Sequence, residues 1–397
     1  MTQGDFATSE ESNSLQGRDA ISTTLFAFAT ASFLVALDRA IFSPLLPEMA
    51  ADLHTTVGRA GLGVTAYVFP YGFFQLLFGP LGDRIGRVQV TRWCFLVFSL
   101  GTGLAAFAPS LGTLIFLRAA TGMCAAAVIP LALAYIGDVI PYESRQRAIT
   151  NLMGATSTGN ALSTAVGGIL GSFVSWRAVF GLYGLIAIVV SAVFFRLPAP
   201  KPPPRDGANP TLSYRAVLSQ RPARLVYGLV ALEGVVVLGA FTYLGSYLRE
   251  RFSLDYFIIG LILACYGVGI LCTSRIFFPR IFRRIPEQRL TLFGGLFLGV
   301  GYLTLAELSI WQVTPLPLFV AGIGFALLHS TLQTRATEFA PGARGSAVSL
   351  FVFCAFAGGG VGSAGFGWVV GAHGYEPVLV FSGLLMLFVG LYAAWKW

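Results

Sequence analysis

Long apolar segments follow one another along most of the chain, separated by short polar stretches. A helix rises about 1.5 Å per residue and the hydrocarbon core of a bilayer is about 30 Å thick, so about 20 apolar residues suffice for one crossing. Twelve segments reach that length, at residues 22–49, 58–81, 89–108, 111–137, 149–174, 178–196, 225–248, 256–278, 290–308, 315–339, 346–370 and 377–395. The pattern predicts an all-α polytopic membrane protein with twelve transmembrane helices.

One polar stretch in the middle of the chain is longer than the others. Residues 197–224 are rich in proline and basic residues, so we expect a semi-rigid cytoplasmic linker. It separates two six-helix bundles, residues 21–196 and 225–397. Residues 1–20 are acidic and lack the pattern of a signal peptide, so we expect a cytoplasmic N-terminal tail.

The two halves also resemble each other. A shift of 199 residues superimposes Arg145 on Arg344 and Gly159 on Gly358. We therefore predict a duplicated six-helix unit, with the two bundles related by pseudo-symmetry.

Composition agrees with a protein that lies in lipid. The 397 residues are 55% hydrophobic and 11% charged, with a mean hydropathy of +0.74. With the N-terminus in the cytoplasm, all but six of the 26 Lys and Arg residues fall on the cytoplasmic side, the exceptions being Arg39, Arg59, Arg118, Arg177, Arg249 and Arg251. The net charge of +8 therefore reflects the positive-inside rule and not nucleic-acid binding. We expect a monomer in the cell (inner) membrane with both termini cytoplasmic.

The sequence offers little for catalysis. Its three histidines are far apart, no Cys/His group has metal-site spacing, and no glycine-rich phosphate loop is present. We therefore expect no enzyme, no metal and no cofactor, and transport driven by ion or solute gradients.

A charged, glycine-rich loop lies between the second and third apolar segments. Its glycines Gly79, Gly82 and Gly86 are expected to permit a tight turn and close helix packing, while Asp83, Arg84 and Arg87 hold the turn in water. A carboxylate at a helix C-terminus opposes the helix dipole, so Asp83 should seek a cation or the N-terminus of another helix. We predict that it clasps the start of the eleventh helix, near Arg344, Gly345 and Ser346.

This loop resembles the Gly-x-x-x-Asp-Arg-x-Gly-Arg motif of the major facilitator superfamily, nearest to its drug:proton antiporter (arabinose-efflux-like) branch. Arg118 and Gly122 match the family's fourth-helix pattern, whereas Ser163-Thr164 replaces the Gly-Pro of its fifth-helix exporter motif. The resemblance implies alternating access by two bundles, with the first, fourth, seventh and tenth helices lining a central cavity. The altered fifth-helix motif weakens the family's link with antiport.

Five ionisable residues lie deep in the predicted helices: Asp38, Arg39, Arg118, Glu233 and His329. Charges in lipid are costly, so each is a functional candidate. Neighbouring positions on a helix point about 100° apart, so Asp38 and Arg39 cannot face each other. Arg118 is within reach of Asp38. Arg39 and Arg118 are candidates for gating or for the charge that meets a substrate, and the Asp38–Arg118 pair could instead be a fixed link between helices.

Glu233 has no cation within one helical turn, which makes it the leading candidate to carry a coupling proton. Asp38 and His329 are the other proton-coupling candidates, and any of the three residues could instead be a packing residue.

Other polar residues could hydrogen-bond a solute or join helices. These substrate-cavity candidates are Tyr67, Tyr71, Gln75, Asn160 and Gln333.

We predict secondary active transport of a small organic solute, with protons as the coupling ion and export as the direction. The alternatives are import of an organic anion or nutrient with an ion, a lipid-like carrier, and a membrane scaffold or sensor.

Overall fold

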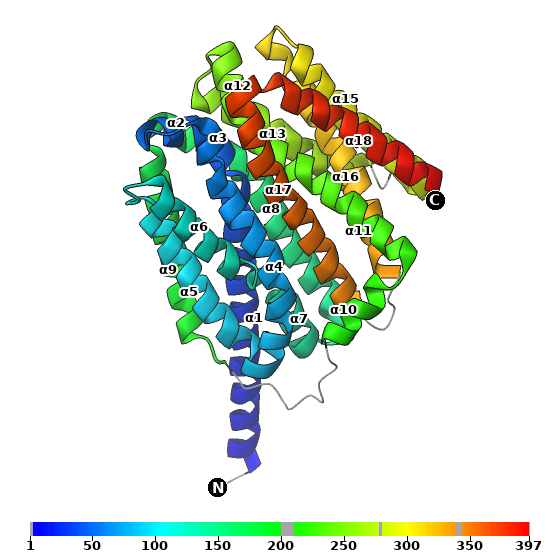
Figure 1. The fold of residues 1–397 in the computed structure, drawn as a ribbon. Helices are drawn as coiled ribbons and strands as arrows, with labels where there is room; N and C mark the ends of the chain where they lie inside the picture. Colours follow the sequence, from blue (N-terminus) through cyan, green and yellow to red (C-terminus); the bar gives the residue numbers. More distant parts are fainter. Residues whose placement is uncertain (1–2, 200–209, 278–279, 339–343, 397) are drawn as a thin grey trace.

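The computed structural model describes residues 3–199, 210–277, 280–338 and 344–396, which form helices and no strand (Figure 1). A helix or a pair of helices occupies each of the twelve predicted segments. The first six correspond to α1 (Gln3–Ala40) with α2 (Phe42–Asp52), α3 (Val57–Ala60) with α4 (Leu62–Ile85), α5 (Arg87–Ala105), α6 (Leu111–Ala125) with α7 (Val128–Val139), α8 (Tyr142–Phe173) and α9 (Trp176–Arg196).

The second six begin after a short helix in the predicted linker, α10 (Pro210–Leu218). They are α11 (Arg221–Gly234), continued by a π-helix (Val235–Ala240) and α12 (Phe241–Phe252), then α13 (Tyr256–Cys272) with a π-helix (Thr273–Phe277), α15 (Glu287–Glu307), α16 (Pro315–Glu338), α17 (Arg344–His373) and α18 (Glu376–Lys396). Short 3₁₀ turns at Phe282–Arg284 and Trp311–Val313 precede α15 and α16.

Eleven of the described helices or helix pairs are long and apolar enough to span a bilayer. The twelfth segment is α8, whose 32 residues exceed the length needed although its first turns are polar. The all-α, twelve-helix prediction is therefore confirmed, while the exact bundle boundaries stay a prediction.

Two of the helices break in mid-membrane for a chemical reason. Pro44 lies four residues after Ala40, where α1 ends, and Pro130 lies four residues after Ala126, where α6 gives way to α7. Proline has no N–H to donate to the carbonyl four residues before it, and its ring clashes with that carbonyl. The seventh segment instead changes to π-helix at Val235.

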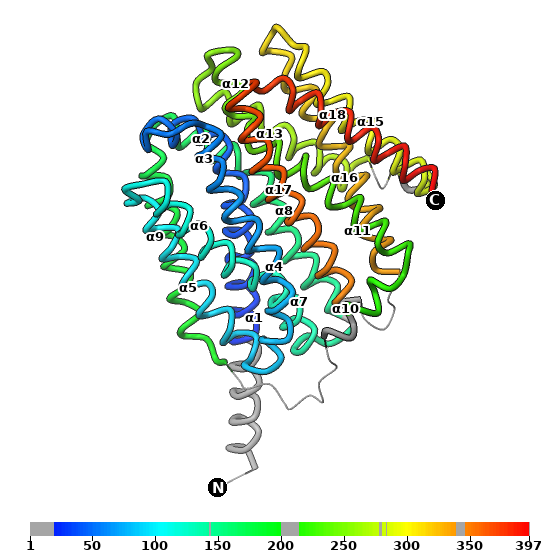
Figure 2. Tube along the Cα trace, viewed as in Figure 1, coloured from blue at the N-terminus to red at the C-terminus, as the bar shows by residue number. Residues whose placement is uncertain are grey.

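The helix ends nearest α10 are called the linker end, and the ends at residues 52–62, 252–256 and 373–376 the opposite end. Tyr214 of α10 donates to the Leu76 carbonyl at 3.1 Å, which ties the linker helix to α4. The chain path in Figure 2 places α2, α3 and α12 together at the opposite end.

The two halves meet tightly at the opposite end. Ser43 Oγ donates to the Phe241 carbonyl at 2.9 Å, and Ser363 Oγ donates to the Gly61 carbonyl at 3.2 Å. Glycine backbones complete the contact, because a Cβ on Gly58 would overlap the Gly367 carbonyl oxygen. The opposite end is therefore closed.

At the linker end, the loop between α4 and α5 forms a charge network within the first half. Arg87 bonds Asp83 at 2.9 Å and Asp138, at the end of α7, at 2.5 Å. Asp83 thus finds a cation within its own motif, and Arg84 is exposed. The side chains of Arg344 and Gly345 lie outside the described residues, so the clasp to α17 stays a prediction.

The three loop glycines do different things. Gly86 has φ of +110°, a conformation that other residues avoid, and it ends α4. A Cβ on Gly82 would overlap Leu131, so Gly82 permits close packing of α4 and α7. A Cβ on Gly79 would meet no atom within 4 Å, so the expected role of Gly79 in turning or packing is wrong for this conformation.

This contrast gives a matched experiment. Gly86→Ala should destabilise the protein by about 1–3 kcal/mol because alanine is strained at that φ. Gly79→Ala, inside α4, should be neutral or stabilise by up to about 1 kcal/mol because alanine favours helix. Apparent Tm in detergent, followed by loss of monodisperse protein, checks both; equal Tm values for the two variants would contradict the strain at Gly86.

Candidate functional site

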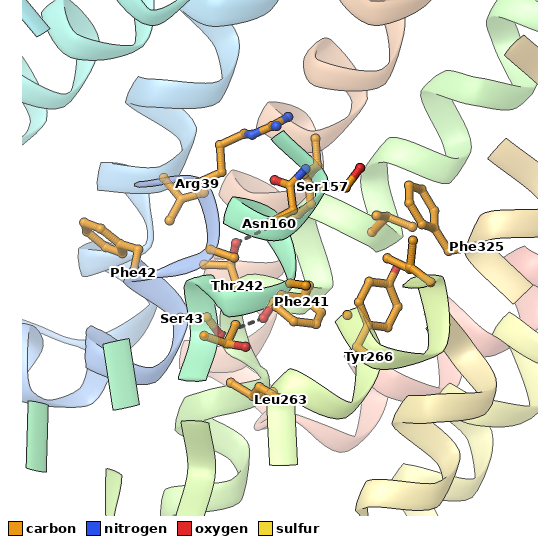
Figure 3. A pocket seen from close by; sticks show the side chains of 18 of the residues that line it. Arg39, Phe42, Ser43, Ser157, Asn160, Phe241, Thr242, Leu263, Tyr266 and Phe325 are labelled. Carbon is orange, nitrogen blue, oxygen red and sulfur yellow. Dashed lines mark hydrogen bonds between the residues drawn. The ribbon is translucent and has the colours of Figure 1, made fainter. Parts of the chain in front are cut away.

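A central cavity of about 220 Å³ lies between the two halves (Figure 3). Its walls come from α1, α2, α4 and α8 of the first half and from the seventh-segment π-helix, α12, α13 and α16 of the second. The described lining residues are Arg39, Ala40, Phe42, Ser43, Val64, Val68, Ser157, Asn160, Ala161, Thr164, Val237, Leu238, Phe241, Thr242, Leu263, Tyr266, Gly267, Ile270, Leu271, Ser274 and Phe325. The cavity is thus built at the interface of the predicted repeats.

The exposure of the lining residues indicates which way the cavity opens. Ser157, Asn160 and Ser274, toward the linker end, are exposed, whereas Ser43 and Phe241, toward the opposite end, are buried. Together with the contacts at the opposite end, this indicates a cavity that opens toward the linker end.

The predicted contact between Asp38 and Arg118 is present. Both side chains are buried, at 0% and 1% exposure, and Arg118 Nη1 donates to Oδ1 and Oδ2 of Asp38 at 3.0 and 2.8 Å. The guanidinium also lies 4.2 Å from the ring centroid of Tyr67 and 5.4 Å from that of Phe42. Aromatic faces attract a cation, so they help to hold Arg118 out of water.

The break after α1 is supported by α8. Ser163 donates to the Leu37 carbonyl and accepts a hydrogen bond from the Ala40 N–H at 3.2 Å. Backbone groups released at a helix break must find other partners in lipid. This chain has Ser163-Thr164 where the family's fifth-helix pattern has Gly-Pro, and Ser163 therefore has a structural role. Ser163 joins α8 to the end of α1 rather than binding solute.

Arg39 points away from the Asp38 pair, as the helical geometry predicts. It lines the central cavity, with its guanidinium carbon 5.9 Å from the ring centroid of Tyr71 and 5.7 Å from that of Phe356. Its Nε is buried and has no hydrogen-bond partner among the described residues. The cavity therefore carries a cation with unused donor capacity.

Glu233 and His329 form a second pair. Oε2 of Glu233 lies 2.7 Å from Nδ1 of His329. Glu233 is 1% exposed, while the His329 side chain is 29% exposed. Glu233 Oε1 is buried without a partner among the described residues.

Glu233 has no cation within one turn of its own helix, as the sequence indicates, but its partner comes from elsewhere in the chain. His329 lies on α16, 96 residues away. The two residues are one unit instead of rival candidates. That unit lies one turn from the cavity, because Val237 follows Glu233 by four residues, Phe325 precedes His329 by four, and both line the cavity.

The two pairs follow the internal repeat. Asp38 lies on the first helix of its half and Arg118 on the fourth, while Glu233 and His329 lie on the first and fourth helices of the second half. Each half thus carries one acid and one base that join the same two helices. The first pair is sealed, and the second is partly open.

Of the substrate-cavity candidates, some line the cavity and others do not. Asn160 lines the central cavity, but Tyr67 packs on Arg118 and Tyr71 stacks on Phe356 with ring centroids 4.4 Å apart. Gln75 and Gln333 are half-buried on α4 and α16 and are not among the lining residues. For both tyrosines the structure favours the packing alternative.

Several residues of the cavity wall went unnoticed in the sequence. Phe241, Tyr266 and Phe325 line it, and ring centroids of Tyr266 lie 5.1 Å from Phe241 and 6.0 Å from Phe325. Aromatic residues occur in every one of the twelve segments, so composition gave no signal. The π-helix that turns Val237 and Leu238 toward the cavity also leaves no mark in hydrophobic periodicity.

Comparisons with known proteins agree with this architecture. The family model of the Major Facilitator Superfamily matches residues 28–363. The MFS-type transporter YceJ of Bacillus subtilis (strain 168) is 27% identical, covering 91% of this chain and 93% of its own. The multidrug efflux protein YfmO of the same organism is 26% identical, covering 92% of each.

A solved structure shares the fold. The crystal structure of a bacterial homolog of the human lysosomal transporter Spinster, in an inward-facing and unoccupied conformation, matches with a TM-score of 0.79 and 16% identity, covering 95% of this chain and 97% of that one. Since the family model covers most of the chain, the conclusion is direct: this chain belongs to the Major Facilitator Superfamily, as a multi-pass secondary transporter of small solutes and not an enzyme.

Proposed function

We propose that this transporter couples solute movement to a proton carried by the Glu233–His329 pair. The observation that carries the proposal is the 2.7 Å contact between Glu233 Oε2 and His329 Nδ1 beside the cavity. Histidine is the side chain best suited to change charge near neutral pH.

The geometry supports a defined proton-binding atom. Because Nδ1 faces Glu233, Nε2 is the ring nitrogen left to accept a proton, and the imidazole is 29% exposed while the carboxylate is buried. The Glu233 carboxylate stabilises the imidazolium that results. A proton can therefore enter through His329 and be held by the pair.

The pair also lies where a change of charge can act on conformation. Glu233 lies two residues before the π-helix that begins at Val235, and π-helical turns are frequent at functional sites. Loading or unloading one proton changes the charge between α11, whose π-helical continuation lines the cavity, and α16, which lines it with Phe325. We propose that this change biases the choice between the two alternating-access states.

Export is the direction that we propose first, and the name of the relative YfmO, a multidrug efflux protein, supports it. The distribution of Lys and Arg supports insertion with both termini in the cytoplasm of the cell (inner) membrane. The cavity would then open to the cytoplasm, and we propose that a monomer is the working unit.

Import of an organic anion together with a proton is the second candidate, and Arg39 favours it. With His329 neutral, the mid-membrane charges of Asp38, Arg39, Arg118 and Glu233 sum to zero. They sum to zero again when one proton and one monoanion are bound together. Both states then avoid the cost of an unbalanced charge in lipid.

The coupling proposal has a direct test in proteoliposomes. Glu233→Gln and His329→Gln should each abolish solute movement driven by a pH gradient, because in either variant the remaining residue cannot exchange a proton as the intact pair does. Counterflow of the same solute should continue. Cationic drugs, sugars and aromatic carboxylates form the screening panel, and gradients of both signs distinguish export from import.

Matched controls are available in the same half. Glu307→Gln, at the exposed end of α15, and His373→Gln, in the last turn of α17, should keep proton-driven transport. If the Glu233→Gln variant still transports solute under a pH gradient, the assignment of proton coupling to the Glu233–His329 pair is wrong. Failure of every solute to move in wild-type vesicles would favour a scaffold or sensor instead.

The Asp38–Arg118 pair should behave as one unit. Asp38→Asn or Arg118→Gln alone should each destabilise the protein by about 3–5 kcal/mol, because the remaining charge is buried without its partner. The double variant should recover most of the apparent Tm but not transport. Measurement of Tm and counterflow in all three variants checks this, and full transport by the double variant would reduce the pair to scaffolding.

A further inference from the structure

We infer that the central cavity selects a small organic monoanion with an apolar, aromatic-sized body, and that Arg39 binds its carboxylate. The inference rests on the proposed transport function but not on its direction or on the proton pair. It concerns equilibrium binding, which can be measured without any gradient.

The first argument is charge. Of the described residues that line the cavity, Arg39 alone carries a full charge, and no carboxylate is among them. The nearest acid along the chain, Asp38, is engaged through both oxygens by Arg118. A cationic solute would meet a guanidinium with no carboxylate beside it in the cavity wall, whereas an anion could pair with it directly.

The second argument is hydrogen bonding. Arg39 Nε is buried and unsatisfied among the described contacts, although guanidinium groups carry five donors. The ring centroids of Tyr71 and Phe356 lie 5.9 and 5.7 Å from the guanidinium carbon, so they can position its plane, but neither accepts a hydrogen bond from Nε. A carboxylate matches the planar fork of an arginine with two parallel bonds.

The third argument is the shape and chemistry of the remaining wall. Figure 3 shows Arg39 and Asn160 toward one side of the cavity, with Tyr266 and Phe325 toward the other. The wall is otherwise mainly aliphatic and aromatic. A ligand therefore meets the guanidinium and amide donors at one end and mainly aromatic surface, with the Tyr266 hydroxyl, at the other, which fits an acid group on a compact aromatic body.

Size limits the ligand further. The cavity of about 220 Å³ is smaller than the roughly 300–1,000 Å³ of pockets that hold drug-sized molecules. A single-ring carboxylate fits this space better than a large drug or a lipid.

Three ligands of one shape test the charge preference: benzoate, benzamide and benzylammonium. Binding to purified protein in detergent, measured by calorimetry at neutral pH, should be at least tenfold tighter for benzoate than for the other two. Arg39→Gln should weaken benzoate at least tenfold and leave benzamide within about twofold, since only the anion uses the charge.

Arg59→Gln is the matched control, because Arg59 is exposed at the opposite end and lies outside the cavity. It should leave the Kd of benzoate unchanged. Arg39→Lys keeps the charge but loses the fork, so it should bind benzoate with intermediate affinity. This variant and the wild-type ranking test the inference even where Arg39→Gln does not fold.

The inference is overturned if wild-type protein does not bind benzoate, if benzylammonium binds as tightly, or if Arg39→Gln keeps the full preference for the anion. These outcomes are separate from those of the coupling experiment. A Glu233→Gln variant that remains proton-driven leaves the binding preference standing, and loss of the preference leaves the proton pair standing.

Discussion

The structure depends on one constraint, which is that a charged side chain buried in lipid needs a partner. An isolated ion in mid-membrane costs several kcal/mol, so Asp38 and Arg118 are each tolerable only because the other is there. Their contact joins the first and fourth helices of one half, and the Tyr67 ring covers the guanidinium. The second half places Glu233 and His329 on the corresponding two helices. One pair is thus fully buried, and the other is partly exposed through His329.

The same constraint governs the backbone. Pro44 and Pro130 interrupt the first and fourth helices, and the carbonyls so released need partners because no water is at hand in lipid. Ser163 meets part of that need at the end of α1. The break after α1 borders the cavity at Ala40 and Phe42, and the break after α6 is buried at Ala126 and Ala127, so irregular backbone occurs where it is buried in protein or borders an open space.

A structural feature could be predicted from the sequence when it depends on neighbouring residues along the chain, and less readily when it depends on residues of other helices. Lipid imposes a local and continuous demand for apolar residues, so the twelve segments and the division into halves could be predicted from hydropathy alone. The Asp38–Arg118 contact could be anticipated from depth, because both helices cross the same membrane. The Glu233–His329 contact was not anticipated, because the search for a cation near Glu233 covered one turn of its own helix and His329 lies on α16. The packing roles of Tyr67 and Tyr71 depend on Arg118 and Phe356, which lie on other helices, so spacing along α4 left two alternatives open.

The closed end of the molecule has a thermal consequence. Backbone meets backbone there, at Gly58 with Gly367 and at Gly245 with Ser43, and the Tyr243 side chain lies against Gly61. The heat capacity of a conformational change grows with the apolar surface that it exposes to water. A seam of glycines exposes little, so opening it should carry a small heat-capacity change. The balance between the two faces of the carrier would then depend on a few hydrogen bonds and on bound charge, and it would shift only gently as the temperature of the membrane changes.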